Sequence, residues 1–99
     1  MTRDAVLEWL DTRRPVPPAE LRARLDAAVT DTELALPEHL ADLGRRVLER
    51  VADGPAAGRA LALELLAADA FITYAFEAQA EADPAGLAAL AARVAEQEP

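Results

Sequence analysis

The sequence of 99 residues contains no cysteine, lysine, serine or asparagine. Without cysteine the chain forms no disulfide, no thiolate redox site and no structural zinc finger. Without serine or cysteine it holds no Ser–His or Cys–His nucleophile, and without lysine it has neither a Schiff-base amine nor a Walker A phosphate loop. Without asparagine there is no acceptor for N-linked glycans. These particular chemistries are therefore excluded within this chain.

The residues that replace the missing types are alanine and arginine. All ten basic residues are arginine, and about 25 of the 99 residues are alanine. Alanine, arginine, glycine and proline have GC-rich codons, whereas lysine and asparagine have AT-rich ones. This usage is typical of a high-GC bacterial genome, which explains the missing residue types without a functional cause.

Acidic residues outnumber basic ones, 18 to 10, and give a formal net charge of -8. Proteins bind nucleic acid by placing arginine and lysine on phosphates, and an acidic surface is repelled by phosphates and by anionic lipids alike. We therefore expect no nucleic-acid partner and no membrane partner. A protein, including a second copy of this chain, or a small molecule is the expected partner.

Charged residues also interrupt each apolar stretch. The longest such stretch, residues 61–76, contains Glu64 and Asp69, whereas a membrane-spanning helix needs about 20 residues with few or no charges. The first 14 residues carry Asp4, Glu8 and Asp11, so they do not resemble a secretory signal. We expect a soluble, cytoplasmic chain.

Prolines and glycines divide the chain into segments with helical periodicity. We expect a short N-terminal helix capped by Thr2, then four main helices, and no segment alternates as a strand would. The expected helices cover about residues 3–13, 18–29, 37–53, 56–82 and 84–97. The sequence thus predicts an all-α fold and a single helical domain over residues 1–99. It is a small helical bundle of four main helices plus a short N-terminal helix, packed around one long central helix.

The long segment 56–82 carries apolar residues around most of its circumference. One face holds Leu61, Leu65, Ile72 and Phe76, and large apolar residues also point elsewhere, namely Leu63, Leu66 and Phe71. A helix that is apolar on many sides is buried on many sides, yet the abundance of alanine predicts a thin core. Two arrangements remain open: a symmetric dimer that covers the second side, or a compact monomer whose short helices wrap the long one. The residues expected at an interface are Leu61, Leu63, Leu66, Phe71, Ile72 and Phe76.

A polar seam runs along the same long segment. Thr73 and Glu77 follow Asp69 at intervals of four residues, and Tyr74 lies beside them. Such a seam can line a pocket for a small molecule or coordinate a hard cation. The alternative is structural: Asp69 pairs with an arginine of a neighbouring helix or lies at the rim of an interface.

His39 is the only histidine. His39 and Asp42 are one helical turn apart and offer two potential metal ligands. A di-iron bundle, however, needs Glu-x-x-His twice, and Leu36 occupies the glutamate position here. We therefore expect His39 to lie on the surface in the first turn of its helix, with no metal and no cofactor.

Two charged clusters and two aromatic residues are the remaining candidates for a binding role. Glu77, Glu81 and Asp83 form an acidic cluster that can bind a cation or simply cap the next helix, and Arg45, Arg46 and Arg50 are expected on a solvated helix face. Trp9 and Tyr74 are expected to anchor packing rather than bind a ligand. In the connection over residues 30–36, Leu34 and Leu36 are expected to enter the core.

The leading functional hypothesis is a non-enzymatic helical interaction module. It would self-associate as a homodimer, or dock on a partner protein, through its long Ala/Leu-rich helix. The second hypothesis is a helical bundle that binds a small molecule or metal ion through Asp69, Thr73 and Tyr74. An enzyme has the least support, because it would need carboxylate, threonine or tyrosine chemistry alone, or a site completed by another subunit.

Overall fold

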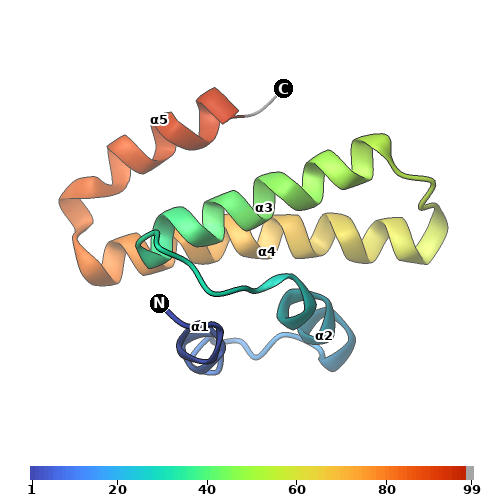
Figure 1. Ribbon diagram of the computed structural model, residues 1–99, viewed down its shortest axis with the longest axis horizontal. Helices are drawn as coiled ribbons and strands as arrows, with labels where there is room; N and C mark the ends of the chain where they lie inside the picture. The colour runs from blue at the N-terminus through green and yellow to red at the C-terminus, as the bar shows by residue number, and fades with distance from the viewer. Residues whose placement is uncertain (98–99) are drawn as a thin grey trace.

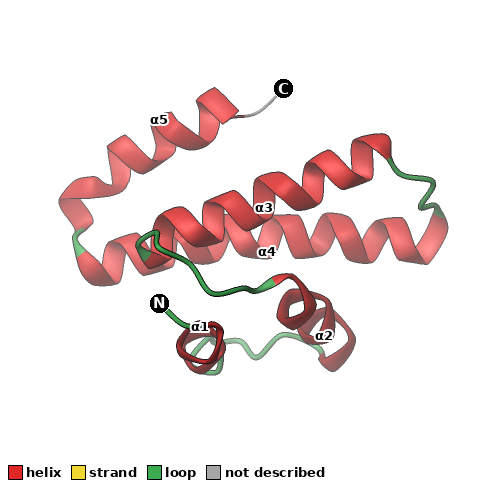
Figure 2. Cartoon of the chain, in the orientation of Figure 1, coloured by secondary structure: helices red, strands yellow, loops and turns green. Residues whose placement is uncertain are grey.

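A computed structural model describes residues 1–97 of the chain (Figure 1). The helices, in chain order, are α1 (Arg3–Leu10), α2 (Ala19–Ala28), α3 (Leu36–Asp53), α4 (Gly58–Ala82), the 3₁₀ turn η1 (Pro84–Gly86) and α5 (Leu87–Gln97). No strand occurs within the described residues, and loops join the helices (Figure 2). The predicted all-α fold is therefore confirmed.

Local sequence signals determine several helix ends. The Thr2 hydroxyl accepts a hydrogen bond from the Ala5 amide and caps α1, as predicted. The Asp83 carboxylate accepts from the Ala85 amide and so separates α4 from η1. The first helix ends at Leu10 rather than near Arg13, because the next amides turn back onto the carbonyls of Trp9 and Leu10. This early end frees Arg13 to point at another helix.

The centre of the fold is the antiparallel pair α3 and α4, which run side by side (Figure 1). The apolar stripe of α3, with Leu40, Leu43 and Val47, packs in one core with Phe71 and the small residues of α4. Gly44 lets α3 and α4 approach each other closely, because a Cβ atom at this position would lie 2.8 Å from Cδ1 of Ile72 in α4. The long helix α4 is unbroken and central, as predicted.

The remaining helices cover two sides of this pair. In Figure 1, α1 and α2 lie on one side and α5 lies on the other. Arg24 of α2 and Arg50 of α3 both reach Glu64 of α4, at 2.6 and 3.1 Å. The Met1 amino group donates to the Thr32 carbonyl at 2.8 Å, which holds the N-terminus against the α2–α3 connection. No helix of residues 1–97 has both the length and the apolar character to cross a membrane.

Two predictions about α3 and the connection before it are wrong. Leu34 is 44% exposed instead of entering the core, while Leu36 is half-buried against it. His39 is only 3% exposed, although we expected it on the surface. The connection that leads into α3 lies against the N-terminal segment, as the hydrogen bonds between Met1 and Thr32 show, and the N-terminal amino group is near enough to lower the pKa of His39. Helical periodicity within α3 contains no information about this neighbour.

Candidate functional site

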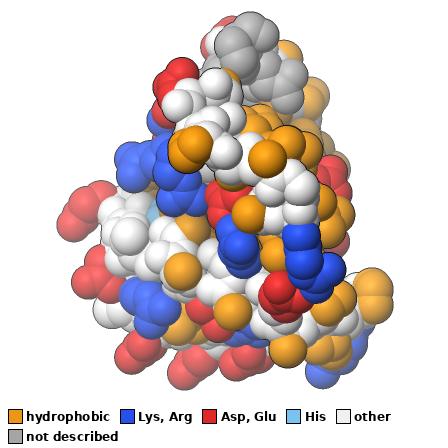
Figure 3. Space-filling view, turned by 90° about the vertical axis from the view of Figure 1, so that its right-hand side faces the viewer, with side chains coloured by type: hydrophobic (Ala, Val, Ile, Leu, Met, Phe, Trp, Pro, Cys, Tyr) orange, Lys and Arg blue, Asp and Glu red, His pale blue; other side chains and the backbone are white. Residues whose placement is uncertain are grey.

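The outer face of α4 is exposed along its first four turns. We call this face the α4 flank, and its members are Arg59, Ala62, Leu65, Leu66, Asp69 and Thr73. Leu65 and Leu66 are 45% and 52% exposed, although large apolar side chains elsewhere in α4 are half-buried or buried. Figure 3 views the end of the molecule that carries the α3–α4 connection and shows hydrophobic side chains at the surface between charged ones. The α4 flank is therefore the part of the long helix that its own chain leaves uncovered.

The structure divides the predicted interface residues into three groups. Leu63 and Phe71 lie in the core of their own chain, so a second chain cannot reach them and their assignment to an interface is corrected. Leu61, Ile72 and Phe76 are half-buried. Of the predicted set only Leu66 is widely exposed, and Leu65 joins it.

The predicted polar seam lines a pocket. Asp69, Thr73, Tyr74 and Glu77 of α4 face the proline-rich α1–α2 connection across a hollow of about 260 Å³, which we call the linker pocket. Its other lining residues are Arg14, Pro15, Val16, Pro17, Pro18, Leu21 and Ala70. Asp69 and Thr73 are exposed. Asp69 forms no ion pair with any residue between 1 and 97, so the expected arginine partner is not there.

Tyr74 forms the aromatic wall of the linker pocket. Its ring packs edge-to-face on Trp9, with 6.1 Å between ring centroids, so both aromatics anchor packing as predicted. Burial, together with the nearby Glu77 carboxylate, raises the pKa of the Tyr74 hydroxyl despite the opposing effect of Arg13 and Arg22. The hydroxyl therefore stays protonated and can donate a hydrogen bond into the pocket.

Behind this wall lies a cluster around Arg13, a residue that the sequence analysis did not single out as a site. Arg13 is 8% exposed, and its Nη1 lies 2.8 Å from both Glu77 Oε1 and Glu81 Oε2. Its guanidinium carbon lies 3.8 Å from the centre of the Trp9 ring, and Trp9 Nε1 donates to Glu81 at 3.1 Å. Arg13 is therefore the counterion of Glu77 and Glu81, while the third acidic residue, Asp83, caps the following turn.

The ionisation of this cluster follows from its contacts. Burial lowers the pKa of Arg13, but the hydrogen bonds that Arg13 donates to Glu81 and Glu77 outweigh that effect and raise its pKa overall. The hydrogen bond from Arg13 lowers the pKa of Glu81. The cluster is thus a charged network that joins α1 to the end of α4.

His39 presents the opposite situation. Its Nε2 atom is buried without a hydrogen-bond partner among the described residues. Burial lowers the pKa of His39, and Arg46 and the N-terminal amino group add to this effect, while Asp42 opposes it. Residues 1–97 hold no group of three or more His, Asp or Glu side chains placed to bind a metal ion. Asp42, the other candidate ligand, instead pairs with Arg45 and Arg46 at 2.7 and 2.9 Å.

The predicted basic patch on α3 is neutralised within the chain. Arg50 binds Glu64, and Arg45 and Arg46 bind Asp42, so these arginines form part of an ion-pair network. Eight of the ten arginines take part in ion pairs within residues 1–97. The other two, Arg3 and Arg14, donate to backbone carbonyls. The charge that is left unpaired on the described surface is mainly acidic.

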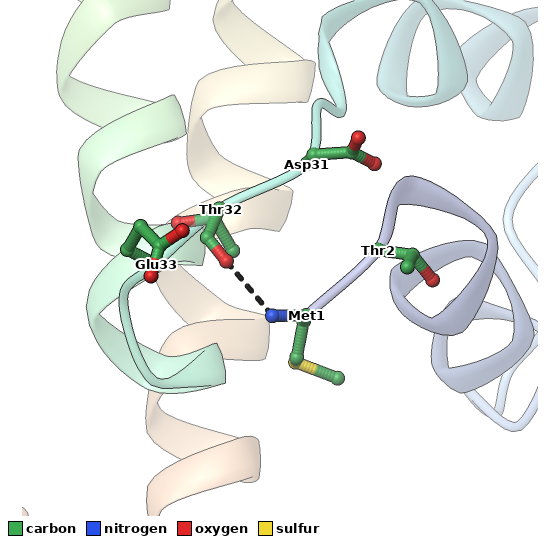
Figure 4. Close-up of a pocket in the computed structure, with 5 residues that line it drawn as sticks. All are labelled: Met1, Thr2, Asp31, Thr32 and Glu33. Carbon is green, nitrogen blue, oxygen red and sulfur yellow. Dashed lines mark hydrogen bonds between the residues drawn. The ribbon is translucent and has the colours of Figure 1, made fainter.

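A second hollow of about 460 Å³ lies where the N-terminus meets the α2–α3 connection (Figure 4). Met1, Thr2, Asp31, Thr32 and Glu33 line it. Glu33 and Asp31 lie on different sides of the Met1 amino group in Figure 4, and Asp31 accepts from the Arg3 amide at 2.6 Å. These groups fasten the N-terminus and do not converge on a common point.

Comparisons of the chain with protein-family models, curated proteins and solved structures gave no match.

Proposed function

We propose that this protein is a non-enzymatic helical interaction module that self-associates, as a homodimer, through the α4 flank. The observation that carries the proposal is the exposure of Leu65 and Leu66, at 45% and 52%, in the middle of the central helix. Both leucines follow Ala62, whose small side chain allows a second helix to approach closely. An exposed apolar patch on an otherwise charged surface is typical of a protein-binding site.

The expected strength of this interaction follows from its size. Complete burial of a leucine side chain is worth about 1.5–3 kcal/mol, so covering the exposed halves of two leucines on each chain contributes roughly 4 kcal/mol to a dimer. Association also costs translational and rotational freedom. We therefore expect a weak dimer that dissociates on dilution.

The test is the double substitution Leu65→Glu/Leu66→Glu. Glutamate on both chains places four like charges in the interface, so we expect size-exclusion chromatography with light scattering to show a monomer at concentrations where the unmodified chain dimerises. The matched control is Ala88→Glu/Ala89→Glu, which adds the same charge at exposed positions of α5. A control that dissociates equally, or a dimer that survives the leucine substitutions, contradicts the proposal.

A second candidate function is supported by the linker pocket. The pocket brings a carboxylate, two hydroxyls and an apolar proline-rich wall together, as Asp69, Thr73, Tyr74 and the α1–α2 connection supply them. Its volume of about 260 Å³ suits a small alcohol or amine. Native mass spectrometry of protein purified from its own host would detect a retained ligand.

The matched variants for this second candidate are Tyr74→Phe and Thr32→Val, of which the latter lies outside the linker pocket. Loss of the added mass in Tyr74→Phe alone supports ligand binding. If all three proteins show only the mass expected from their own sequences, without any adduct, ligand binding is contradicted.

A further inference from the structure

We infer that the α4 flank binds the same flank of a second copy in antiparallel orientation, with Arg59 of each chain opposite Asp69 of the other. This inference rests on the proposed function and specifies its partner and geometry. Arg59 and Asp69 carry opposite charges near the two ends of the exposed flank, on either side of Leu65 and Leu66. A surface with this pattern is complementary to itself when one copy is reversed.

The spacing of the flank residues fits packing between two helices. Arg59, Ala62, Leu66, Asp69 and Thr73 follow one another at intervals of three, four, three and four residues, and all five are exposed. This alternation keeps a stripe on one side of a helix over successive turns, which is the requirement for a two-helix seam. The stripe is about 21 Å long at 1.5 Å per residue. Leu65 lies beside the stripe and widens it.

The register follows from the positions of these residues. If the two-fold axis passes level with residue 64, Leu66 of one chain lies opposite Ala62 of the second copy. The same register places Arg59 opposite Asp69. The two-fold axis repeats both juxtapositions. The dimer therefore gains two contacts between a leucine and an alanine and two ion pairs between an arginine and an aspartate. A parallel dimer would instead place Arg59 against Arg59 and Asp69 against Asp69, which is repulsive.

The charges of the rest of the molecule favour this surface over other faces. The net charge of -8 opposes the association of two copies in general. The flank itself carries one positive and one negative residue, so its own charge is balanced. Asp69 has no ion-pair partner within residues 1–97, and the Arg59 side chain remains 76% exposed although it contacts Glu20. Both groups are therefore accessible to a second copy.

Charge reversal provides the first test. We expect Asp69→Arg to weaken the dimer about tenfold in sedimentation velocity, because two attractive contacts become repulsive. The double variant Arg59→Asp/Asp69→Arg restores opposite charges and should recover most of that loss. Glu20→Gln is the control for the contact that Arg59 makes within its own chain, and because it frees Arg59 it should leave the dimer at least as strong as that of the unmodified chain. If the double variant is folded by circular dichroism but its dimer is not strengthened relative to that of Asp69→Arg, the antiparallel register is overturned.

Cysteine cross-linking provides an independent test, since the chain has no native cysteine. Arg59→Cys and Asp69→Cys chains are mixed and oxidised. Equivalent positions in the antiparallel dimer are about 15 Å apart along the helix axes, beyond the reach of a disulfide, whereas position 59 lies level with position 69 of the second copy. We expect only the mixed disulfide.

The possible failures are distinguishable. Disulfides between identical positions, together with a dimer that Asp69→Arg does not weaken, overturn the antiparallel register and leave self-association intact. An unmodified chain that stays monomeric at every concentration overturns the proposed self-association and this inference together.

Discussion

At the scale of the residue, two ionisable side chains, Arg13 and His39, are both buried but are stabilised to very different degrees. Arg13 contacts two carboxylates and the face of Trp9. His39 Nε2 has no hydrogen-bond partner among the described residues. Burying a polar group is costly unless its hydrogen bonds are replaced, so these two positions should respond oppositely to substitution.

Substitution of Arg13 by alanine should destabilise the fold. Two carboxylates lose their counterion and Trp9 loses its cation–π contact, and because Glu77 and Glu81 are half exposed we expect a loss of about 2 kcal/mol in urea unfolding at pH 7. Arg14→Ala at the adjacent exposed position is the control, with a loss of about 0.5 kcal/mol or less. Equal losses for the two variants would show that the cluster contributes no stability.

The same cluster predicts a dependence on acid. Because Arg13 lowers the pKa of Glu81 in the folded chain, the unfolded chain binds a proton more readily. The stabilisation is therefore complete above the ordinary glutamate pKa of about 4.3 and is lost as the pH falls below it. The difference in stability between the unmodified chain and Arg13→Ala should shrink from pH 6 to pH 3, and a constant difference would contradict the assignment.

His39 should make the fold sensitive to milder acid. Its folded-state pKa lies below the ordinary histidine value of about 6.5, so the unfolded chain takes up the proton first and stability falls as the pH drops below that value. His39→Leu removes both the titration and the unpaired Nε2. We expect this variant to be more stable by about 1 kcal/mol at pH 7. Its thermal unfolding should also lose the pH dependence between pH 5 and 7, and an unchanged slope would assign that dependence to another group.

Local contacts of single residues could be predicted from the sequence, whereas long-range ones could not. The caps at Thr2 and Asp83 depend on residues at most three positions apart, and the structure confirms them. The ion pair between Asp42 and Arg46 is of the same local kind, because the two residues are one helical turn apart. Helical spacing alone would equally pair Glu20 with Arg24, yet Glu20 contacts Arg59 and Arg24 contacts Glu64. Both arginine contacts join different helices, and helix spacing alone does not specify which helices are neighbours.

At the scale of the element, the packing of α3 against α4 includes a close contact at Gly44. Gly44 lies against Ile72, and a Cβ atom at Gly44 would also lie 3.2 Å from the Ala68 carbonyl oxygen. A side chain at this position would therefore meet both the Ile72 side chain and the backbone of Ala68.

Gly44→Val should reduce the stability of the fold. The branched side chain meets Ile72 and the backbone of Ala68, and overpacking of this kind costs about 1–3 kcal/mol. The control is Ala52→Val, which places the same side chain at an exposed position of α3. We expect the control to lose less than 1 kcal/mol in urea unfolding, because it changes helix propensity alone. A Gly44→Val chain as stable as the control would show that α3 and α4 are loosely packed.

Helical periodicity predicted the elements well, because apolar residues recur at helical spacing, and because Gly54 ends α3 and Pro84 follows the end of α4. It could not determine which side of α4 the chain itself covers. Leu63 and Leu66 are both leucines on the same helix, yet the first is buried and the second is exposed. Their difference arises from tertiary packing, since neighbouring helices cover the side of α4 that carries Leu63 and leave the side that carries Leu66 open. The polar seam, by contrast, was recognisable because its four residues lie within nine positions of one helix, although the proline-rich wall opposite them was not.

At the scale of the whole molecule, an excess of acidic charge surrounds a small, balanced and partly apolar strip on α4. Most arginines are held in ion pairs within the chain, so the rest of the described surface repels a second copy. Electrostatic repulsion of this kind weakens when salt screens it, while burial of leucine does not. The α4 flank is therefore the surface on which the account of this protein depends.

Sedimentation equilibrium of the unmodified chain tests this account most directly. The monomer has a mass of 10.6 kDa. Over about a hundredfold range of concentration that reaches the millimolar, we expect the apparent mass to rise from this value towards twice this value, as a weak dimer requires. An apparent mass that remains at that of the monomer throughout the range would contradict self-association through α4.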